Sequence, residues 1–144
     1  KELKWQKNMP AQSSVKITEL TVQDLPAEAD KCFAILTTDY TANKEKSKHT
    51  ETILFTEPKN YILPQANVTT QTKYKNGYCQ VRLTSDNPAL YAMLETPGIK
   101  GVFSDNSFAV VPGVEKIVTF TPGVPCGIDD FNSALKITHL RQTY

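Results

Sequence analysis

Apolar and polar residues alternate in short runs along most of the chain, and these runs are rich in Thr, Val, Ile, Tyr and Phe. A period of two is typical of strands with one buried face, whereas a helix repeats every three or four residues. No window longer than about ten residues shows a convincing helical repeat. Besides a hairpin around residue 76, the pattern predicts strands at residues 15–22, 31–40, 50–57, 89–95, 107–111, 115–120 and 134–141.

The clearest element is the hairpin in the stretch VTTQTKYKNGYCQVRLTS, which begins at Val68. Asn76 and Gly77 favour the two positive φ angles of a tight turn, and they therefore pair Lys75 with Tyr78. This register gives a dry face made of the pairs Tyr74 with Cys79, Thr72 with Val81 and Thr70 with Leu83. The wet face carries Lys73, Gln71, Gln80 and Arg82.

Turn signals separate the remaining strands. Pro-Gly pairs suited to tight turns stand at Pro97-Gly98, Pro112-Gly113 and Pro122-Gly123. Two prolines between residues 57 and 67 disfavour continuous pairing, so an ordered crossover is expected there, with Tyr61, Ile62 and Leu63 packed. Eight to ten short strands with frequent turns predict an all-β fold, and an antiparallel immunoglobulin-like β-sandwich is the leading choice.

Length and charge narrow the classes of function. A chain of 144 residues with 40% hydrophobic residues can bury one core, so residues 1–144 are predicted to form a single β-sandwich domain. The net charge of +1 comes from 16 basic and 15 acidic side chains that are interleaved, which argues against nucleic acid as a partner. The densest basic stretch, residues 43–49, is predicted to be a solvated loop. No apolar run approaches the ~20 residues that span a bilayer, so the chain is expected to be soluble.

Metal and disulfide chemistry find little support. Cys32, Cys79 and Cys126 include no CxxC pair, so neither a zinc site nor a disulfide scaffold is predicted. A Cys32–Cys79 bridge between two sheets stays open, although the only tryptophan precedes both cysteines, unlike in antibody domains. Calcium ligation by the oxygen atoms of Asp129, Asp130 and Asn132 is a minor alternative, because GIDDFNS fits a turn before the last strand. No metal or cofactor is expected.

No set of catalytic residues emerges either. There is no GxSxG element. His139 is expected to end a strand on the same face as Leu135 and Ile137, satisfied by a neighbour, and His49 to lie exposed in a charged loop. Paired carboxylates could serve a glycosidase, but Asp105, Asp129 and Asp130 are loop acids without a defined partner. No catalytic residue is therefore assigned.

Two surface features point weakly to sugars. Aromatic platforms could be offered by Trp5, Tyr40, Tyr61, Tyr91 and Tyr144, although packing or an edge position explains most of them. Asn67-Val68-Thr69 matches a glycosylation acceptor, and within a predicted hairpin strand it is interpreted as a coincidence.

The most unusual stretch is GVFSDNSFAVVPG, residues 101–113. Gly101 permits a close approach or an unusual backbone angle, while Phe103 and Phe108 can anchor in the core. Asp105 or Asn106 can hydrogen-bond the backbone two residues on, which predicts a tight corner. If Asp105 closes this turn, its replacement by Ala is expected to cost about 1 to 2 kcal/mol of stability.

The segment from Leu83 to Pro122 resembles the C-terminal immunoglobulin-like domain of β-mannosidases in glycoside hydrolase family 2. The element G-x-F-S-D-N-x-F of that family is matched by Gly101, Phe103, Ser104, Asp105, Asn106 and Phe108. Pro112-Gly113 and Phe120 match the turn and the strand that follow it. Upstream, ILFTEPKNYILPQANV is similar to the family's Phe-x-x-Pro-Lys crossover and its Leu-Pro pair.

The resemblance implies a C-terminal fragment of a multidomain enzyme that hydrolyses terminal β-mannosides with retention. The catalytic glutamates of that family lie in a (β/α)₈ barrel of about 250 residues, which this chain cannot contain. Its implied role is that of a non-catalytic domain that braces the enzyme, with the other domains and a mannose-containing glycan as partners. A periplasmic or secreted location is implied, or a lysosomal one in a eukaryote.

Three alternatives stay open. The parent enzyme could act on β-glucosaminides, since such enzymes carry a similar terminal domain. The chain could instead be an independent carbohydrate-binding module, which needs an exposed row of aromatic residues, or an interaction domain with no link to hydrolysis.

Overall fold

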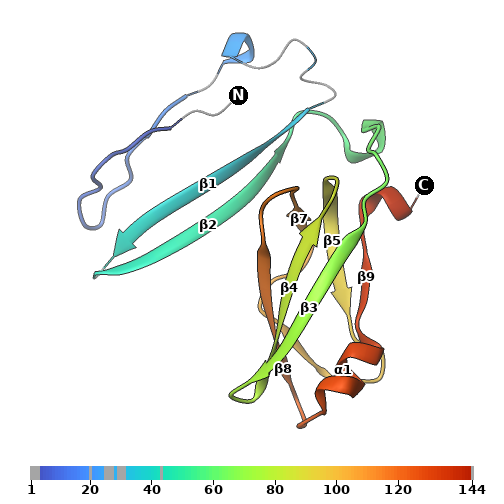
Figure 1. The fold of residues 1–144 in the computed structure, drawn as a ribbon. Coiled ribbons are helices and arrows are strands. Elements are labelled where there is room, and N and C mark those ends of the chain that lie inside the picture. The colour runs from blue at the N-terminus through green and yellow to red at the C-terminus, as the bar shows by residue number, and fades with distance from the viewer. Residues whose placement is uncertain (1–3, 20, 25–27, 29–31, 43, 144) are drawn as a thin grey trace.

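The computed structural model describes residues 4–19, 21–24, 28, 32–42 and 44–143. In this part of the chain, nine strands form three antiparallel sheets. Two of the sheets face each other as a β-sandwich, and a two-stranded hairpin precedes them (Figure 1). The all-β immunoglobulin-like architecture predicted from the sequence is therefore confirmed.

The sandwich consists of a four-stranded and a three-stranded sheet. The first has the order β3-β4-β8-β6, with bounds Val68–Lys75, Tyr78–Ser85, Lys116–Pro122 and Gly101–Phe103. The second has the order β7-β5-β9, with bounds Phe108–Val110, Ala89–Glu95 and Lys136–Thr138.

The β3–β4 hairpin has the predicted register, from Lys75 opposite Tyr78 to Thr70 opposite Leu83. Its turn residues Asn76 and Gly77 have φ angles of 49° and 85°, as the turn chemistry requires. The β4 side of the dry face is fully buried, whereas the β3 side is only partly covered because β3 is an edge strand. The burial of a side chain therefore depends on the place of its strand in the sheet as well as on the alternation of apolar and polar residues along that strand.

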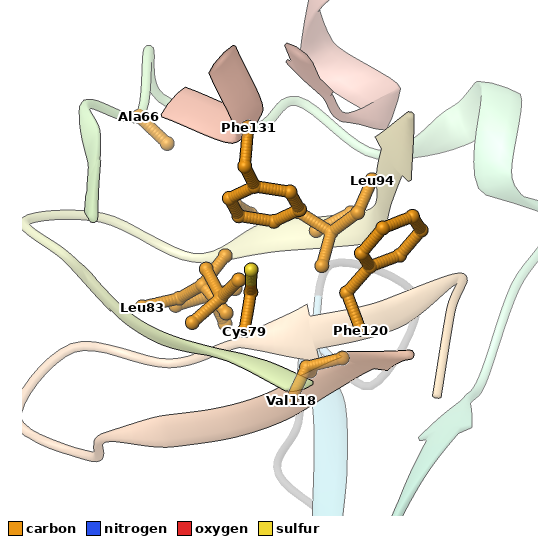
Figure 2. Close-up of a cluster of buried hydrophobic side chains, with 11 residues drawn as sticks. Ala66, Cys79, Leu83, Leu94, Val118, Phe120 and Phe131 are labelled. Atoms are coloured by element: carbon orange, nitrogen blue, oxygen red, sulfur yellow. The ribbon is translucent and has the colours of Figure 1, made fainter. Parts of the chain in front are cut away.

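The core lies between the two sheets. Buried side chains of β4 and β8 meet those of β5 and β7, and Figure 2 shows Cys79, Leu83, Phe120 and Leu94 converging there. The Phe120 ring lies 5.2 Å from that of Phe131. This contact joins β8 to the segment that contains Phe131, and apolar burial of this kind is the main stabilising interaction of the sandwich.

A short helix, α1 (Ile128–Ala134), closes one end of the sandwich (Figure 1). The turn predicted for GIDDFNS is therefore wrong. Asp129 and Asp130 lie in the first helical turn, where carboxylates interact favourably with the exposed backbone N–H groups, and Phe131 is buried in the core. The strand predicted at residues 134–141 is consequently reduced to β9 and followed by a 3-10 helix, η4 (Leu140–Gln142).

Several boundaries also differ from the prediction. No strand is found in the described part of residues 15–22, where a 3-10 helix, η1 (Val22–Asp24), begins instead. Gly98 and Gly113 have positive φ angles in their turns, but Gly123 does not, because Pro122 still belongs to β8. Strand β6 was not predicted, since its three residues pair only with β8, far along the chain.

The crossover between the hairpin and the sandwich contains a 3-10 helix, η3 (Pro58–Asn60). Beyond it the chain is extended, and Tyr61 and Leu63 are buried while Ile62 is 95% exposed. The prediction that all three residues pack is wrong for Ile62, because neighbouring side chains of an extended backbone point to opposite sides.

The N-terminal hairpin joins β1 (Phe33–Ala42) to β2 (Glu45–Leu54), from Phe33 opposite Leu54 to Ala42 opposite Glu45. Residues 45–49 thus lie in a strand, and the solvated loop predicted for residues 43–49 is wrong for them. Their charged side chains are exposed, so the period-two signal of burial is missing. None of the described helices is long and apolar enough to cross a membrane.

Candidate functional site

The motif GVFSDNSF, which contains the six residues that match the family element, forms the connection between the two sheets of the sandwich. Gly101 and Phe103 lie in β6 of the four-stranded sheet, whereas Phe108 lies in β7 of the three-stranded sheet. Residues 104–107 carry the chain from one sheet to the other. The motif is therefore a corner of the sandwich, here called the β6–β7 corner.

Gly101 permits a close approach between strands. A Cβ atom at this position would lie 2.3 Å from the Phe120 ring and 2.6 Å from the carbonyl oxygen of Thr121. Neither distance leaves room for a carbon atom. The sequence predicted either a close approach or an unusual backbone angle for this glycine. The close approach is confirmed, whereas the φ angle of Gly101 is not positive.

Phe103 and Phe108 both pack against the core cluster. The Phe103 ring lies 4.7 Å from that of Phe120, in a tilted arrangement. The Nζ atom of Lys116 lies over the Phe108 ring, 4.7 Å from its centre, which is the geometry of a cation–π interaction. The two rings thus anchor the two ends of the corner.

The side chain of Asn106 bonds to the backbone of β5. Its Oδ1 atom accepts a hydrogen bond from the Leu94 N–H at 2.8 Å, and its Nδ2 atom donates one to the Leu94 carbonyl at 3.0 Å. Leu94 is buried, and unpaired backbone groups at such a position are costly. The carboxamide therefore replaces the peptide group of a neighbouring strand.

Ser104 and Asp105 both bond to residues of strand β8. The Ser104 N–H donates to the Thr119 carbonyl at 2.8 Å, and Ser104 Oγ accepts from the Thr119 N–H at 3.0 Å. Asp105 forms an ion pair with Lys116, and both side chains are partly exposed. These bonds join the corner to β8 and do not run to the backbone two residues on. The prediction that Asp105 closes the turn locally is therefore wrong, and Asp105 instead contacts a strand that lies later in the sequence.

His139 is buried, with 3% of its surface exposed, and lies just before η4. Among the residues that the structure describes, neither Nδ1 nor Nε2 has a hydrogen-bond partner, which contradicts the expectation that a neighbour satisfies the ring. A general base needs a second group that orients it, and the described part of the chain offers His139 none. His49 is exposed on β2, as expected of a residue in a charged stretch.

The acidic residues occupy structural positions. Asp86 accepts hydrogen bonds from the backbone N–H and the side-chain amide of Asn67, at 2.8 and 2.7 Å, and these bonds lower the pKa of its carboxyl group.

Calcium ligation by Asp129, Asp130 and Asn132 was the minor alternative from the sequence. The Oδ1 atom of Asn132 instead accepts a hydrogen bond from Thr72 Oγ1 at 2.6 Å. The described residues contain no group of three or more His, Cys, Asp or Glu side chains that could hold a metal ion.

The three cysteines are free thiols. Cys79 is fully buried in the core cluster, and Cys126, not Cys32, packs against that cluster. The backbone carbonyl of Cys32 instead accepts a hydrogen bond from the Tyr61 hydroxyl at 2.8 Å. The sequence left a Cys32–Cys79 bridge open, and the structure does not form it, since both thiols are free.

The exposed aromatic side chains do not form a row. Tyr40 lies on β1, Tyr91 on β5 and Trp5 in the N-terminal segment, while Tyr61 is buried. Tyr144 lies outside the described residues. A shallow hollow on the first hairpin includes Tyr40 but is otherwise lined by residues 39, 41 and 46–48, with Lys46 and Lys48 among them.

The family match is limited to the sandwich, whereas the structural match extends over most of the chain. A sequence model of an Ig-fold domain, the one found in mannosidases, matches residues 63–143. Beta-mannosidase A from Aspergillus aculeatus is 36% identical over 107 residues, which cover 68% of this chain and 11% of that relative. The crystal structure of Beta-D-Mannosidase from Dictyoglomus thermophilum has the same fold, with a TM-score of 0.71 at 22% identity over 91% of this chain and 15% of that one.

Proposed function

The chain belongs to the Ig-fold domain family of mannosidases, and on this premise we propose that it serves as a non-catalytic accessory domain of a larger glycosidase. The parent enzyme in this proposal is a retaining β-mannosidase of glycoside hydrolase family 2. The observation that carries the proposal is the match at residues 63–143, which coincides with the sandwich from before β3 to the end of η4.

The acidic residues of the sandwich support a role without catalysis. Retaining glycosidases use two carboxyl groups about 5 to 5.5 Å apart, both free to act on the sugar. Here Asp86 is held by Asn67, Asp105 pairs with Lys116 and Glu115 pairs with Arg82. In the proposal, the catalytic glutamates therefore belong to another part of the parent enzyme.

The packing of Tyr61 supports the bracing role. Its hydroxyl donates to the Cys32 carbonyl and accepts from the Phe55 N–H at 3.1 Å, and these two residues flank the paired strands at the open end of the first hairpin. Its ring meets that of Phe33 edge to face, with centres 6.5 Å apart. Leu90 of β5 belongs to the same buried cluster. One side chain thus connects the sandwich to the polypeptide that precedes it.

The first experiment separates the domain from the catalyst. We expect the 144-residue chain to leave a chromogenic β-mannoside intact, and the product of the complete reading frame to hydrolyse it. A β-glucosaminide assayed in parallel distinguishes the alternative parent substrate. Turnover by the 144-residue chain, or a complete protein without glycosidase activity, would refute the proposal.

The second experiment tests bracing within the complete protein, with Tyr61→Ala compared with Tyr40→Ala as the control. We expect Tyr61→Ala to shorten the half-life of thermal inactivation while kcat and KM at low temperature stay unchanged, because only packing between the two parts is lost. Tyr40 is half exposed on the hairpin, and its replacement should change neither quantity. A loss of kcat with an unchanged half-life would contradict bracing.

A further inference from the structure

Two thiols that are far apart in the sequence meet inside the sandwich. Cys79 lies near the start of β4, an inner strand of the four-stranded sheet, directly opposite Phe120 on β8, and none of its surface is exposed. Cys126 lies between the end of β8 and the start of α1, partly exposed, and packs against the cluster that contains Cys79. Figure 2 shows the sulfur atom of Cys79 pointing into this cluster, between Leu83 and Phe120.

The two thiol groups also lie close enough to influence each other. Burial, followed by the charge of the nearby Cys126 thiol, raises the pKa of the Cys79 thiol, and both side chains pack in the same apolar cluster. A disulfide requires this kind of adjacency, because two cysteines that are distant in the fold cannot be joined without moving the backbone. Cys32 lies elsewhere, before β1, where its carbonyl bonds to Tyr61.

We propose that Cys79 and Cys126 are a site of oxidative modification, at which a disulfide donor of the glutathione class converts the two thiols into a cross-link between β4 and the β8–α1 loop. This inference does not depend on the parent enzyme, because it rests only on side chains within the sandwich.

The chemistry proceeds by two thiol–disulfide exchanges. The thiolate of Cys126, which is the more accessible, attacks the donor disulfide, whose S–S bond breaks to give a mixed disulfide at Cys126 and one donor thiolate. The Cys79 thiol then loses its proton and attacks the Sγ atom of Cys126, and the second donor thiolate leaves. Both cysteines are thereby oxidised and the donor is reduced to two thiols, which take up the two protons released.

The cross-link would act on the end of the sandwich that α1 closes. Phe131 of α1 stacks on Phe120 of β8, which is the direct partner of Cys79. A bond from Cys126 to Cys79 therefore fixes the loop before α1 to an inner strand of the sheet and restricts the unfolded chain. The folded protein should become more resistant to heat once it is oxidised.

Peptide mapping tests the site directly. The folded chain is incubated with oxidised glutathione, its remaining thiols are blocked with N-ethylmaleimide, and it is digested with trypsin without reduction. We expect a linked pair of peptides, residues 76–82 with residues 117–136, and a blocked Cys32 in the peptide of residues 32–44. Blocking of all three cysteines, or a link that involves Cys32, would overturn the proposal.

Matched variants give a second measurement. Cys32→Ser should keep the link and show an upward shift of the thermal midpoint on oxidation that dithiothreitol reverses. Cys126→Ser changes a partly exposed residue, should still fold, and should lose both the link and the shift. An equal shift in Cys126→Ser would show that oxidation acts elsewhere and would refute the proposed cross-link.

Discussion

The chain contains two long antiparallel hairpins whose surroundings differ. The β3–β4 hairpin pairs on through β4 with β8, and its Cys79, Val81 and Leu83 side chains are fully buried. The β1–β2 hairpin is longer, with ten paired residues in each strand, but it forms a sheet by itself. Leu36, Tyr40 and Ile53 on its strands are each more than 40% exposed.

The comparison teaches that a regular register does not by itself create a stable element. Both hairpins have continuous pairing, yet a two-stranded sheet without a covered face is at best marginally stable in water. The β3–β4 hairpin gains its stability from β8, which pairs with it in the same sheet, and from the apolar side chains that β5 and β7 of the facing sheet place over it. The first hairpin gains contact with the sandwich mainly at its open end, through the cluster around Tyr61 and Leu90.

The largest expected difference comes from removing the same side chain in each hairpin. Leu83→Ala should lower the free energy of unfolding by about 2 to 5 kcal/mol, because it leaves a cavity in a filled core. Leu36→Ala on β1 should cost less than about 1 kcal/mol, since this side chain is 42% exposed. Urea denaturation followed by circular dichroism measures both values.

Similar costs for these two variants would break the comparison. Within the complete protein the Leu36 variant gains a further meaning. A large cost there, with a small one in the 144-residue chain, would show that another part of the protein covers the first hairpin.

Gly101→Ala tests packing in β6, the strand at the opposite edge of the four-stranded sheet from β3. The added methyl group would collide with the Phe120 ring and the Thr121 carbonyl, so we expect a loss of about 1 to 3 kcal/mol in the free energy of unfolding. Gly98→Ala provides a contrast, because its Cβ would meet no atom and only its φ of 85° would be strained. A Gly101 variant as stable as the wild type would mean that β6 can move away from β8 at little cost.

At the β6–β7 corner, Asn106→Ala should be more damaging than Asp105→Ala. The first substitution leaves the buried N–H and carbonyl of Leu94 unpaired, which costs about 1 to 3 kcal/mol. The second removes a partly exposed ion pair with Lys116, worth about 0 to 1 kcal/mol. Thermal unfolding of the two variants measures the order, and the reverse order would refute the role assigned to Asn106.

The smallest effect concerns the open end of the β3–β4 hairpin, where Asp86 binds Asn67. Because these hydrogen bonds lower the pKa of Asp86 below its ordinary value of 3.8, the stabilisation is complete above that pH. It is lost as the pH falls through the lowered pKa. Asp86→Ala should therefore be slightly less stable than the wild type at pH 7, and the difference should vanish in strong acid. A difference that stays constant down to acid pH would show that ionisation of Asp86 is not involved.

Local chemistry explains which parts of the fold the sequence predicts. Asn76 and Gly77 fix the turn of one hairpin within a few residues, and its whole register follows from them. The second half of β2 was predicted within residues 50–57, but residues 45–49 escape detection because charged residues occupy both faces of the strand there. Helix α1 escapes because seven residues are too few for a helical repeat, so the burial of Phe131 becomes visible only once the sheets are in place.

The candidate site was predictable in position but not in its bonds. The glycine, the two phenylalanines and the polar residues between them indicate a corner without any knowledge of the rest of the fold. The pairing of Asn106 with Leu94 and the meeting of Cys79 with Cys126 each join distant segments, and no periodicity along the chain encodes which segments meet.

The central place of β4 in its sheet also sets an order in time. Its pairing with β3 needs only a tight turn, which closes within about 1 to 10 μs, whereas pairing with β8 must wait for the intervening strands to be gathered. Pulsed hydrogen exchange during refolding should therefore protect the β3–β4 amides before those of β8. During synthesis on the ribosome, the apolar side of β4 stays exposed until β8 has been made. A chaperone that recognises exposed apolar strands would bind β4 during that interval.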